Sequence, residues 1–177
     1  MAKAFVLINC EPGSDDYVVS KLRSIETVKS AYGIFGLYDV IAQLESNSEE
    51  NLENDITEKV RNLEKILGTT TLIAESGTDM LAEIFAKKQE NLKDKNTAKA
   101  YVVIRSDKVD EYNILHDLSK IPEVIDGNAV VGYYEIICKV AAPTYNDIED
   151  VITKKIRKLN NVNSTVTLNV IPYKRNN

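Results

Sequence analysis

The chain has 177 residues, of which 44% are hydrophobic and 28% charged, and its net charge is −5. No apolar run approaches the roughly 20 residues of a membrane-spanning helix. The apolar N-terminus, residues 1–8, is too short for a secretory signal, so we expect a cytoplasmic protein. The acidic balance excludes a broad nucleic-acid surface, which needs clustered Lys and Arg. The basic run at 154–158 alternates with apolar residues, as a solvated helix face does.

The sequence contains an internal repeat. Ala98 lies 96 residues after Ala2, and this offset holds without a gap over about 73 residues, with roughly a quarter of positions identical. Chance similarity does not keep one register for so long. We therefore predict two copies of one folding unit, residues 1–75 and 98–173, joined by a linker at 76–97.

Four stretches of each copy have the short apolar pattern of β-strands. The second and third stretches flank a Gly-containing pair, Gly36-Leu37 or Gly132-Tyr133, and predict a hairpin. The predicted strands are residues 3–10, 28–35, 38–44 and 69–74 in the first copy, and 98–104, 124–131, 134–140 and 165–171 in the second.

Apolar residues recur at helical spacing after the first and third strands of each copy. Ser14 is placed as an N-cap, and Ser46 with Glu49 as a capping box. The stripes are Val18, Leu22 and Ile25, then Leu52, Ile56, Val60 and Leu63, repeated as Ile114, Leu118 and Ile121, then Ile148, Ile152, Ile156 and Leu159. The order βαββαβ predicts an α+β fold of the ferredoxin-like type, with both helices on one face of an antiparallel sheet.

The second face of such a sheet needs a cover, which another sheet of the same kind can supply, in the same chain or another. In the linker, an apolar stripe predicts an amphipathic helix, followed by a flexible tether over residues 87–96. The stripe consists of Met80, Leu81, Ile84 and Phe85, and it is shorter than two heptads, which disfavours a coiled coil.

The sequence offers little for catalysis. It has no Ser/His/Asp set, phosphate loop or zinc spacing, so we predict no catalytic residue, no metal site and no cofactor. The single histidine, His116, aligns with Ser20, which favours a solvent-facing side chain. Cys10 and Cys138 occupy non-equivalent positions, which favours reduced core thiols. A metal held by scattered carboxylates, His116 or a cysteine stays an alternative.

Residues 28–42, VKSAYGIFGLYDVIA, and 66–73, ILGTTTLI, resemble the effector (RAM) domain of the feast/famine (Lrp/AsnC) transcriptional regulators. The resemblance covers residues 3–74 and, more faintly, 99–171. Members of that family carry an N-terminal helix-turn-helix domain, whereas this sequence begins at the first strand. We therefore expect stand-alone effector domains in tandem, without direct DNA binding.

The resemblance implies that paired sheets form a dimeric α/β barrel and that small effectors, typically amino acids, bind at interfaces between units. Rings of dimers are usual in the family. The implied partners are thus a small effector, other copies of this chain, or DNA-binding regulators.

The resemblance also implies site residues. Gly36, Tyr38 and Asp39 match the effector loop, and Thr69 and Thr71 match the threonine-rich final strand. A glycine lets backbone amides approach a ligand carboxylate, an aspartate can pair with an ammonium group, and hydroxyls can serve either group. Each residue also has a structural explanation: a hairpin φ, an Asx turn, or strand propensity.

The second copy keeps Gly132, Tyr134, Thr165 and Thr167, but Glu135 replaces Asp39 and the bulkier Tyr133 replaces Leu37. The longer acid predicts that the two sites are unequal. Two other functions remain open. One is an enzyme of the dimeric α/β-barrel monooxygenase type. The other is an interaction module that binds full-length regulators and changes their assembly.

Overall fold

The computed structural model describes residues 1–75 and 79–172. Their contacts divide the chain into two compact units. Unit 1 comprises Met1–Ala74 together with the described C-terminal residues Ile171 and Pro172. Unit 2 comprises Glu75–Val170.

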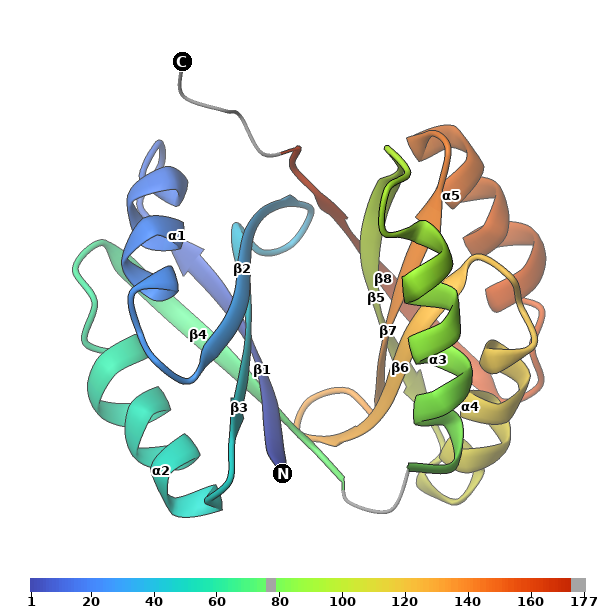
Figure 1. Ribbon diagram of the computed structural model, residues 1–177, viewed down its shortest axis with the longest axis horizontal. Helices are drawn as coiled ribbons and strands as arrows, with labels where there is room; N and C mark the ends of the chain where they lie inside the picture. The colour runs from blue at the N-terminus through green and yellow to red at the C-terminus, as the bar shows by residue number, and fades with distance from the viewer. Residues whose placement is uncertain (76–78, 173–177) are drawn as a thin grey trace. The chain divides into compact units, whose positions relative to one another are not determined.

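Unit 1 has the predicted βαββαβ order. Its strands are β1 (Ala2–Cys10), β2 (Val28–Phe35), β3 (Val40–Ser46) and β4 (Ile66–Ala74), and its helices are α1 (Asp15–Arg23) and α2 (Glu49–Asn54), which continues as a π-helical turn, Asp55–Val60. The strands pair antiparallel in the order β4-β1-β3-β2. Both helices cover one face of this sheet (Figure 1).

Unit 2 repeats this order and adds one helix. Its strands are β5 (Ala98–Ser106), β6 (Val124–Val131), β7 (Ile136–Ala142) and β8 (Val162–Val170), paired antiparallel in the order β8-β5-β7-β6. Its helices are α3 (Asp79–Leu92), α4 (Glu111–Ser119) and α5 (Tyr145–Val151), with a 3-10 turn at Lys108–Asp110 and a π-helical turn at Ile152–Ile156. The predicted α+β class with ferredoxin-like units is confirmed.

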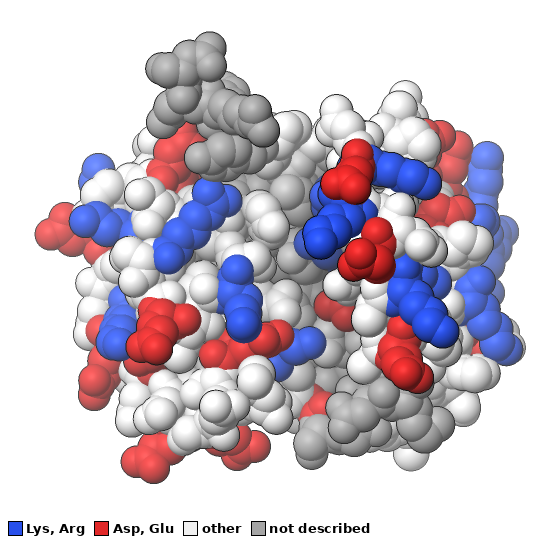
Figure 2. Space-filling model, in the orientation of Figure 1, with Lys and Arg blue, Asp and Glu red and all other residues white. Residues whose placement is uncertain are grey.

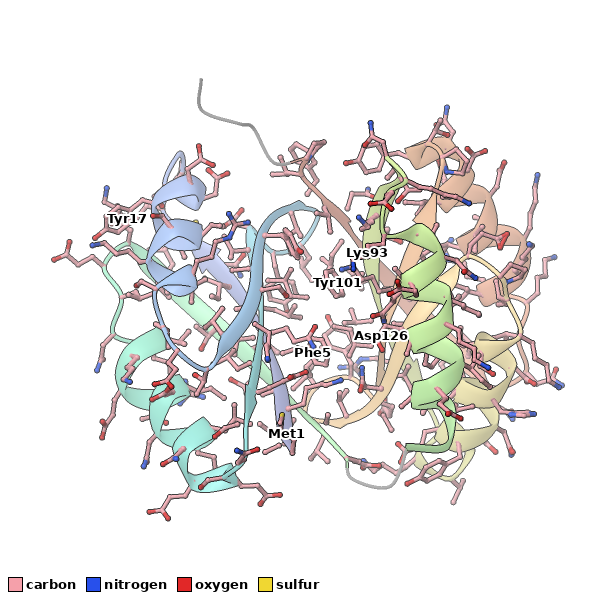
Figure 3. All side chains as sticks on the ribbon, in the orientation of Figure 1. Met1, Phe5, Tyr17, Lys93, Tyr101 and Asp126 are labelled. Atoms are coloured by element: carbon pink, nitrogen blue, oxygen red, sulfur yellow. The ribbon has the colours of Figure 1, made fainter. Side chains whose placement is uncertain are left out.

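Alternation along the central strand divides its side chains between two faces. In β1, Ala4, Val6 and Ile8 belong to the core that also contains Val18 and Leu22 of α1. Phe5 lies on the opposite face of the sheet and is 1% exposed (Figure 3). Both faces of β1 are therefore buried, which explains its nearly continuous apolar sequence.

The second helix of each unit departs from the prediction. The capping box predicted at Ser46 and Glu49 is wrong: Ser48 is the N-cap and its hydroxyl accepts from the backbone N–H of Asn51 at 3.2 Å. Ser46 instead accepts from the backbone N–H of Ser48 at 3.2 Å. The helix then widens, with Arg61 N–H donating to the Ile56 carbonyl, five residues back, at 3.0 Å. The spacing of hydrophobic residues in the sequence does not distinguish such a π turn from an α-helix.

Ser14 occupies the predicted N-cap position of α1 but makes no capping hydrogen bond. Its hydroxyl donates instead to the Glu11 carbonyl at 2.5 Å. Thr144 in unit 2 forms the capping box that the sequence analysis missed, with Asp147 as its partner.

Helix α3 extends further than the sequence predicted. It continues to Leu92, so the tether expected over 87–96 is wrong for residues 87–92. The reason is that its second half docks on unit 2: Gln89 donates to the Ile125 carbonyl at 2.8 Å. The Lys88 ammonium donates to three carbonyls where α4 ends and β6 begins, those of Ser119, Ile121 and Val124, at 2.7, 2.8 and 2.9 Å.

A glycine makes room for this helix. A Cβ atom at Gly127 would lie 3.2 Å from Leu115 Cδ2 and 3.3 Å from Cζ of Phe85, which is 2% exposed. The equivalent residue in unit 1 is Ala31, where no counterpart of Phe85 stands among the described residues. Docking of α3 therefore accounts for a difference between the repeats.

Unit 2 also contains a buried acid. Glu111, at the start of α4, is 3% exposed, and burial together with its contact with Glu75 raises its pKa from 4.5 to about 7. Lys108 lies 2.7 Å from Glu75 Oε1 and 3.8 Å from Glu111 Oε2, and Glu135 faces the same group. The hydrogen bonds from Glu111 and Lys108 lower the pKa of Glu75, so Glu111 is the group that holds the proton.

Charged side chains of both signs are interspersed on the face of each unit shown in Figure 2, without a broad patch of one sign. The basic residues Lys154 and Lys155 are exposed, as predicted. No helix among the described residues is long and apolar enough to span a bilayer.

We expect Lys88→Met to destabilise unit 2 by about 2–4 kcal/mol, because three partly buried carbonyls lose a charged donor. Urea unfolding followed by circular dichroism measures the loss. Lys87→Met, on the neighbouring exposed position of α3, is the matched control and should unfold as the wild type does. Equal stability of the two variants would contradict the assigned role of Lys88.

We also expect the stability of unit 2 to fall as the pH rises from about 5 to about 7. In that window the folded chain keeps the Glu111 proton, whereas the unfolded chain has lost it, so folding is linked to proton uptake. Glu111→Gln stays neutral and should flatten the profile, while Glu149→Gln, at an exposed position, should not. Thermal unfolding across this pH range provides the comparison.

Candidate functional site

The hairpin between β2 and β3 is held to the end of β1 by Asp39. The Asp39 backbone N–H donates to the Ile8 carbonyl at 2.9 Å, and Asp39 Oδ2 accepts from the Cys10 backbone N–H at 2.9 Å. Ile34 N–H donates to the Asp39 carbonyl at 2.9 Å, which closes the hairpin. Between them Gly36 has a φ of 139°, a value that favours glycine.

Unit 2 reproduces this arrangement with the longer acid. Glu135 N–H donates to the Ile104 carbonyl at 3.0 Å, and Glu135 Oε2 accepts from Ser106 N–H at 3.2 Å. Gly132 has a φ of 150°. In both units one acid oxygen is therefore occupied by the backbone, which leaves the other oxygen for a ligand.

The tyrosine two residues after each hairpin glycine is buried. Tyr38 is 9% exposed, and its hydroxyl lies 3.4 Å from Thr70 Oγ1. Tyr134 is 4% exposed, and Val166 replaces Thr70 at the equivalent position. The tyrosine of unit 1 therefore has a polar neighbour that the sequence analysis did not select.

The four predicted threonines lie on the helix-covered face of their sheets. Thr69 and Thr71 pair with Ile8 and Val6, whose side chains are in the core beneath α1 and α2, and directly paired residues share a face. By the same register Thr165 and Thr167 share a face with Ile104 and Val102. Thr165 accepts from Arg157 Nε at 2.9 Å, and Thr71 Oγ1 is buried without a hydrogen-bond partner among the described residues. The structure thus brings Tyr38 to Thr70 and leaves the threonines on either side facing the helices.

A cationic and aromatic cluster distinguishes the hairpin of unit 2. The Arg105 guanidinium carbon lies 3.8 Å from the centre of the Tyr133 ring, and the Tyr133 and Tyr134 rings meet edge-to-face with centres 5.1 Å apart. Unit 1 has Asn9 and Leu37 at these positions. Sequence comparison of the repeats noted Tyr133 but gave Arg105 no role.

The residues considered for catalysis or metal binding are one histidine and two cysteines. His116 is exposed, as predicted, and Cys10 and Cys138 are buried and unpaired. Burial raises the pKa of the Cys138 thiol to about 12, so it stays protonated at neutral pH. Within the described part of the chain, no three His, Cys, Asp or Glu side chains are grouped so that they could hold a metal.

Residues 3–78 and 99–173 each match the Lrp/AsnC ligand binding domain. The chain belongs to this family. The matched segments correspond to the two predicted copies, so the resemblance seen in the sequence is confirmed for both.

The chain is similar to individual proteins as well. The uncharacterised HTH-type transcriptional regulator PH1916 of Pyrococcus horikoshii is 25% identical over 141 residues, which span 73% of this chain and 92% of that protein. The crystal structure of hypothetical protein PHS023 from the same organism is 36% identical and covers 44% of this chain and 94% of that one, with a TM-score of 0.42.

A second structure covers both units. The siroheme decarboxylase NirDL shares 10% identity with this chain, covers 96% of it and 71% of the decarboxylase chain, and gives a TM-score of 0.67. At this identity the likeness shows the fold alone, and it agrees with the predicted fold class.

We expect Asp39→Ala to destabilise unit 1 by about 1–3 kcal/mol, because the Cys10 N–H loses its acceptor. Asp39→Asn is the matched control, since its side-chain oxygen can still accept that hydrogen bond. Urea unfolding of the three proteins is the measurement. If the alanine variant is as stable as the asparagine variant, the hydrogen bond does not hold the hairpin.

Proposed function

We propose that this protein is a ligand-sensing regulatory module that binds a small effector, an amino acid, near its β2–β3 and β6–β7 hairpins. The observation that carries the proposal is that both copies match a ligand binding domain of transcriptional regulators. Ligand sensing in regulation is the role that this family implies, and the module acts in the cytoplasm.

The chemistry of the hairpins supports an amino-acid effector. Asp39 keeps one carboxylate oxygen for an ammonium group while the other accepts from Cys10, and Gly36 exposes backbone amides where a carboxylate can approach. The Tyr38 hydroxyl adds a polar group that can donate or accept. The proposed ligand-contacting residues are Gly36, Tyr38 and Asp39, with Gly132, Tyr134 and Glu135 in the second copy. Thr69, Thr71, Thr165 and Thr167, which the family resemblance also implies, lie on the helix-covered face of their sheets, so the hairpin ligand is proposed to bind without them.

Regulation follows if the effector favours one assembly over another. A ligand shifts an equilibrium only by its difference in affinity for the two states. We propose that the relevant states are assemblies of this chain with itself or with DNA-binding regulators, the kind of protein to which PH1916 belongs by name. Apolar side chains at equivalent hairpin positions support an interface: Phe35, Leu37, Val131 and Tyr133 are 54–63% exposed.

The test has two readouts on the wild-type protein. A thermal-shift screen against the twenty L-amino acids should find a saturable increase in Tm, because a ligand that binds only the folded state stabilises it by about 2.7 kcal/mol at a hundred times its Kd. Sedimentation velocity with the same amino acid should show a changed oligomer distribution. The D-enantiomer is the control.

Absence of any amino-acid shift in Tm and in sedimentation would overturn the proposal and favour a purely oligomerising module. A shift in Tm without a change in assembly would retain the binding site and remove the proposed regulatory output.

A further inference from the structure

Arg105 stands out in unit 2 because its position is fixed while its donors are unused. The guanidinium carbon lies over the Tyr133 ring, 3.8 Å from its centre, and 5.8 Å from the centre of the Tyr134 ring. Stacking on aromatic faces is a favourable geometry for a guanidinium and restricts its rotation. The two tyrosines are themselves held edge-to-face.

A guanidinium carries five N–H donors and no acceptor. Within the described residues, the Arg105 side chain makes ring contacts only, without a hydrogen bond or an ion pair. Two other arginines differ: Arg23 donates to the Ala31 carbonyl at 2.8 Å, and Arg157 donates to Thr165.

The neighbouring hairpin acid does not pair with Arg105. Glu135 Oε2 accepts from the backbone of Ser106, the residue next to Arg105, at 3.2 Å. The partly buried Arg105 charge therefore has no ion-pair partner among the described residues, and an external anion can compensate it.

We infer that Arg105 and Tyr133 form a binding site for the carboxylate of a small ligand, and that this site exists in the second copy alone. The inference rests on the proposed function in taking the hairpin as the ligand-binding end of the unit, and it names the chemical group recognised there. The first copy, with Asn9 and Leu37, has neither the charge nor the ring.

The planar fork of the guanidinium matches the two oxygens of a carboxylate. Tyr133 is 63% exposed, so the ring that orients Arg105 also offers an apolar surface to the ligand's side chain. A phosphate group shares the oxyanion chemistry. The single positive charge of Arg105 balances a monoanion, which favours the carboxylate.

The test follows the Nε–Hε cross-peak of Arg105 in a ¹⁵N-labelled full chain, identified by its loss in Arg105→Lys. Sodium acetate, sodium phosphate and sodium chloride are titrated at matched ionic strength. We expect a saturable shift with acetate. An equal shift with chloride, or a shift with phosphate alone, would overturn the carboxylate assignment.

Variants taken from the first copy supply the controls. Arg105→Asn and Tyr133→Leu place the residues of unit 1 in unit 2, and retained backbone cross-peaks verify their fold. We expect backbone shifts on acetate addition to disappear in Arg105→Asn. In Arg105→Lys, which keeps the charge but loses the bidentate fork, we expect acetate to bind about tenfold more weakly.

The reciprocal variant tests for a gain of acetate binding, which misfolding cannot produce. Asn9→Arg combined with Leu37→Tyr should create a second acetate-sensitive arginine cross-peak, in unit 1. Acetate binding that is unchanged in Arg105→Asn would refute the site. If acetate shifts Arg105 but amino acids leave sedimentation unchanged, the site stands and the proposed regulatory function fails.

Discussion

The structure of each unit depends on the burial of its central strand on both faces. Every residue from Ala4 to Ile8 in β1 and from Ala100 to Ile104 in β5 is at most 2% exposed. A strand buried in this way must have its backbone groups paired on both sides, which β3 and β4, or β7 and β8, accomplish. The order of the sheet follows from this requirement, and the hairpin chemistry is placed at the ends of these strands.

The same requirement gives Asp39 and Glu135 a structural task. The ladder between β1 and β4 shifts register at Asn9 and Cys10, where β1 ends, and the Asp39 side chain accepts from the Cys10 N–H there. The Glu135 side chain likewise accepts from the Ser106 N–H, at the place where the ladder between β5 and β8 shifts register. An acid at this position thus stabilises the fold and keeps an oxygen close to solvent, so the structural and ligand-binding explanations of the residue do not exclude one another.

Sequence patterns predicted the presence and order of the strands because period-two alternation and turn residues are local signals. The bounds of some strands were wrong: the last strand of each copy begins three residues earlier than predicted, at Ile66 and Val162, and the third begins two residues later, at Val40 and Ile136. Val28–Phe35 and Val124–Val131 have the predicted bounds. The contact of Tyr38 with Thr70 could have been predicted from the sequence, since alternation places Thr70 on the face opposite Thr69 and Thr71. The contacts of Lys88 could not have been predicted, because its partners are backbone carbonyls of a distant segment. The Arg105 stack depends likewise on a hairpin conformation that brings together residues far apart in sequence.

Docking of α3 makes the face formed by α4 and β6 in unit 2 different from the face formed by α1 and β2 in unit 1. The face formed by α4 and β6 is occupied by Phe85, Lys88 and Gln89, whereas the corresponding face of α1 and β2 has no such helix among the described residues. On the first unit, Ile171 lies against Gly33 of β2 beside Asp15 of α1. The two copies therefore present chemically different surfaces at this equivalent place, so a ligand or protein that recognises one of them does not meet the same surface on the other.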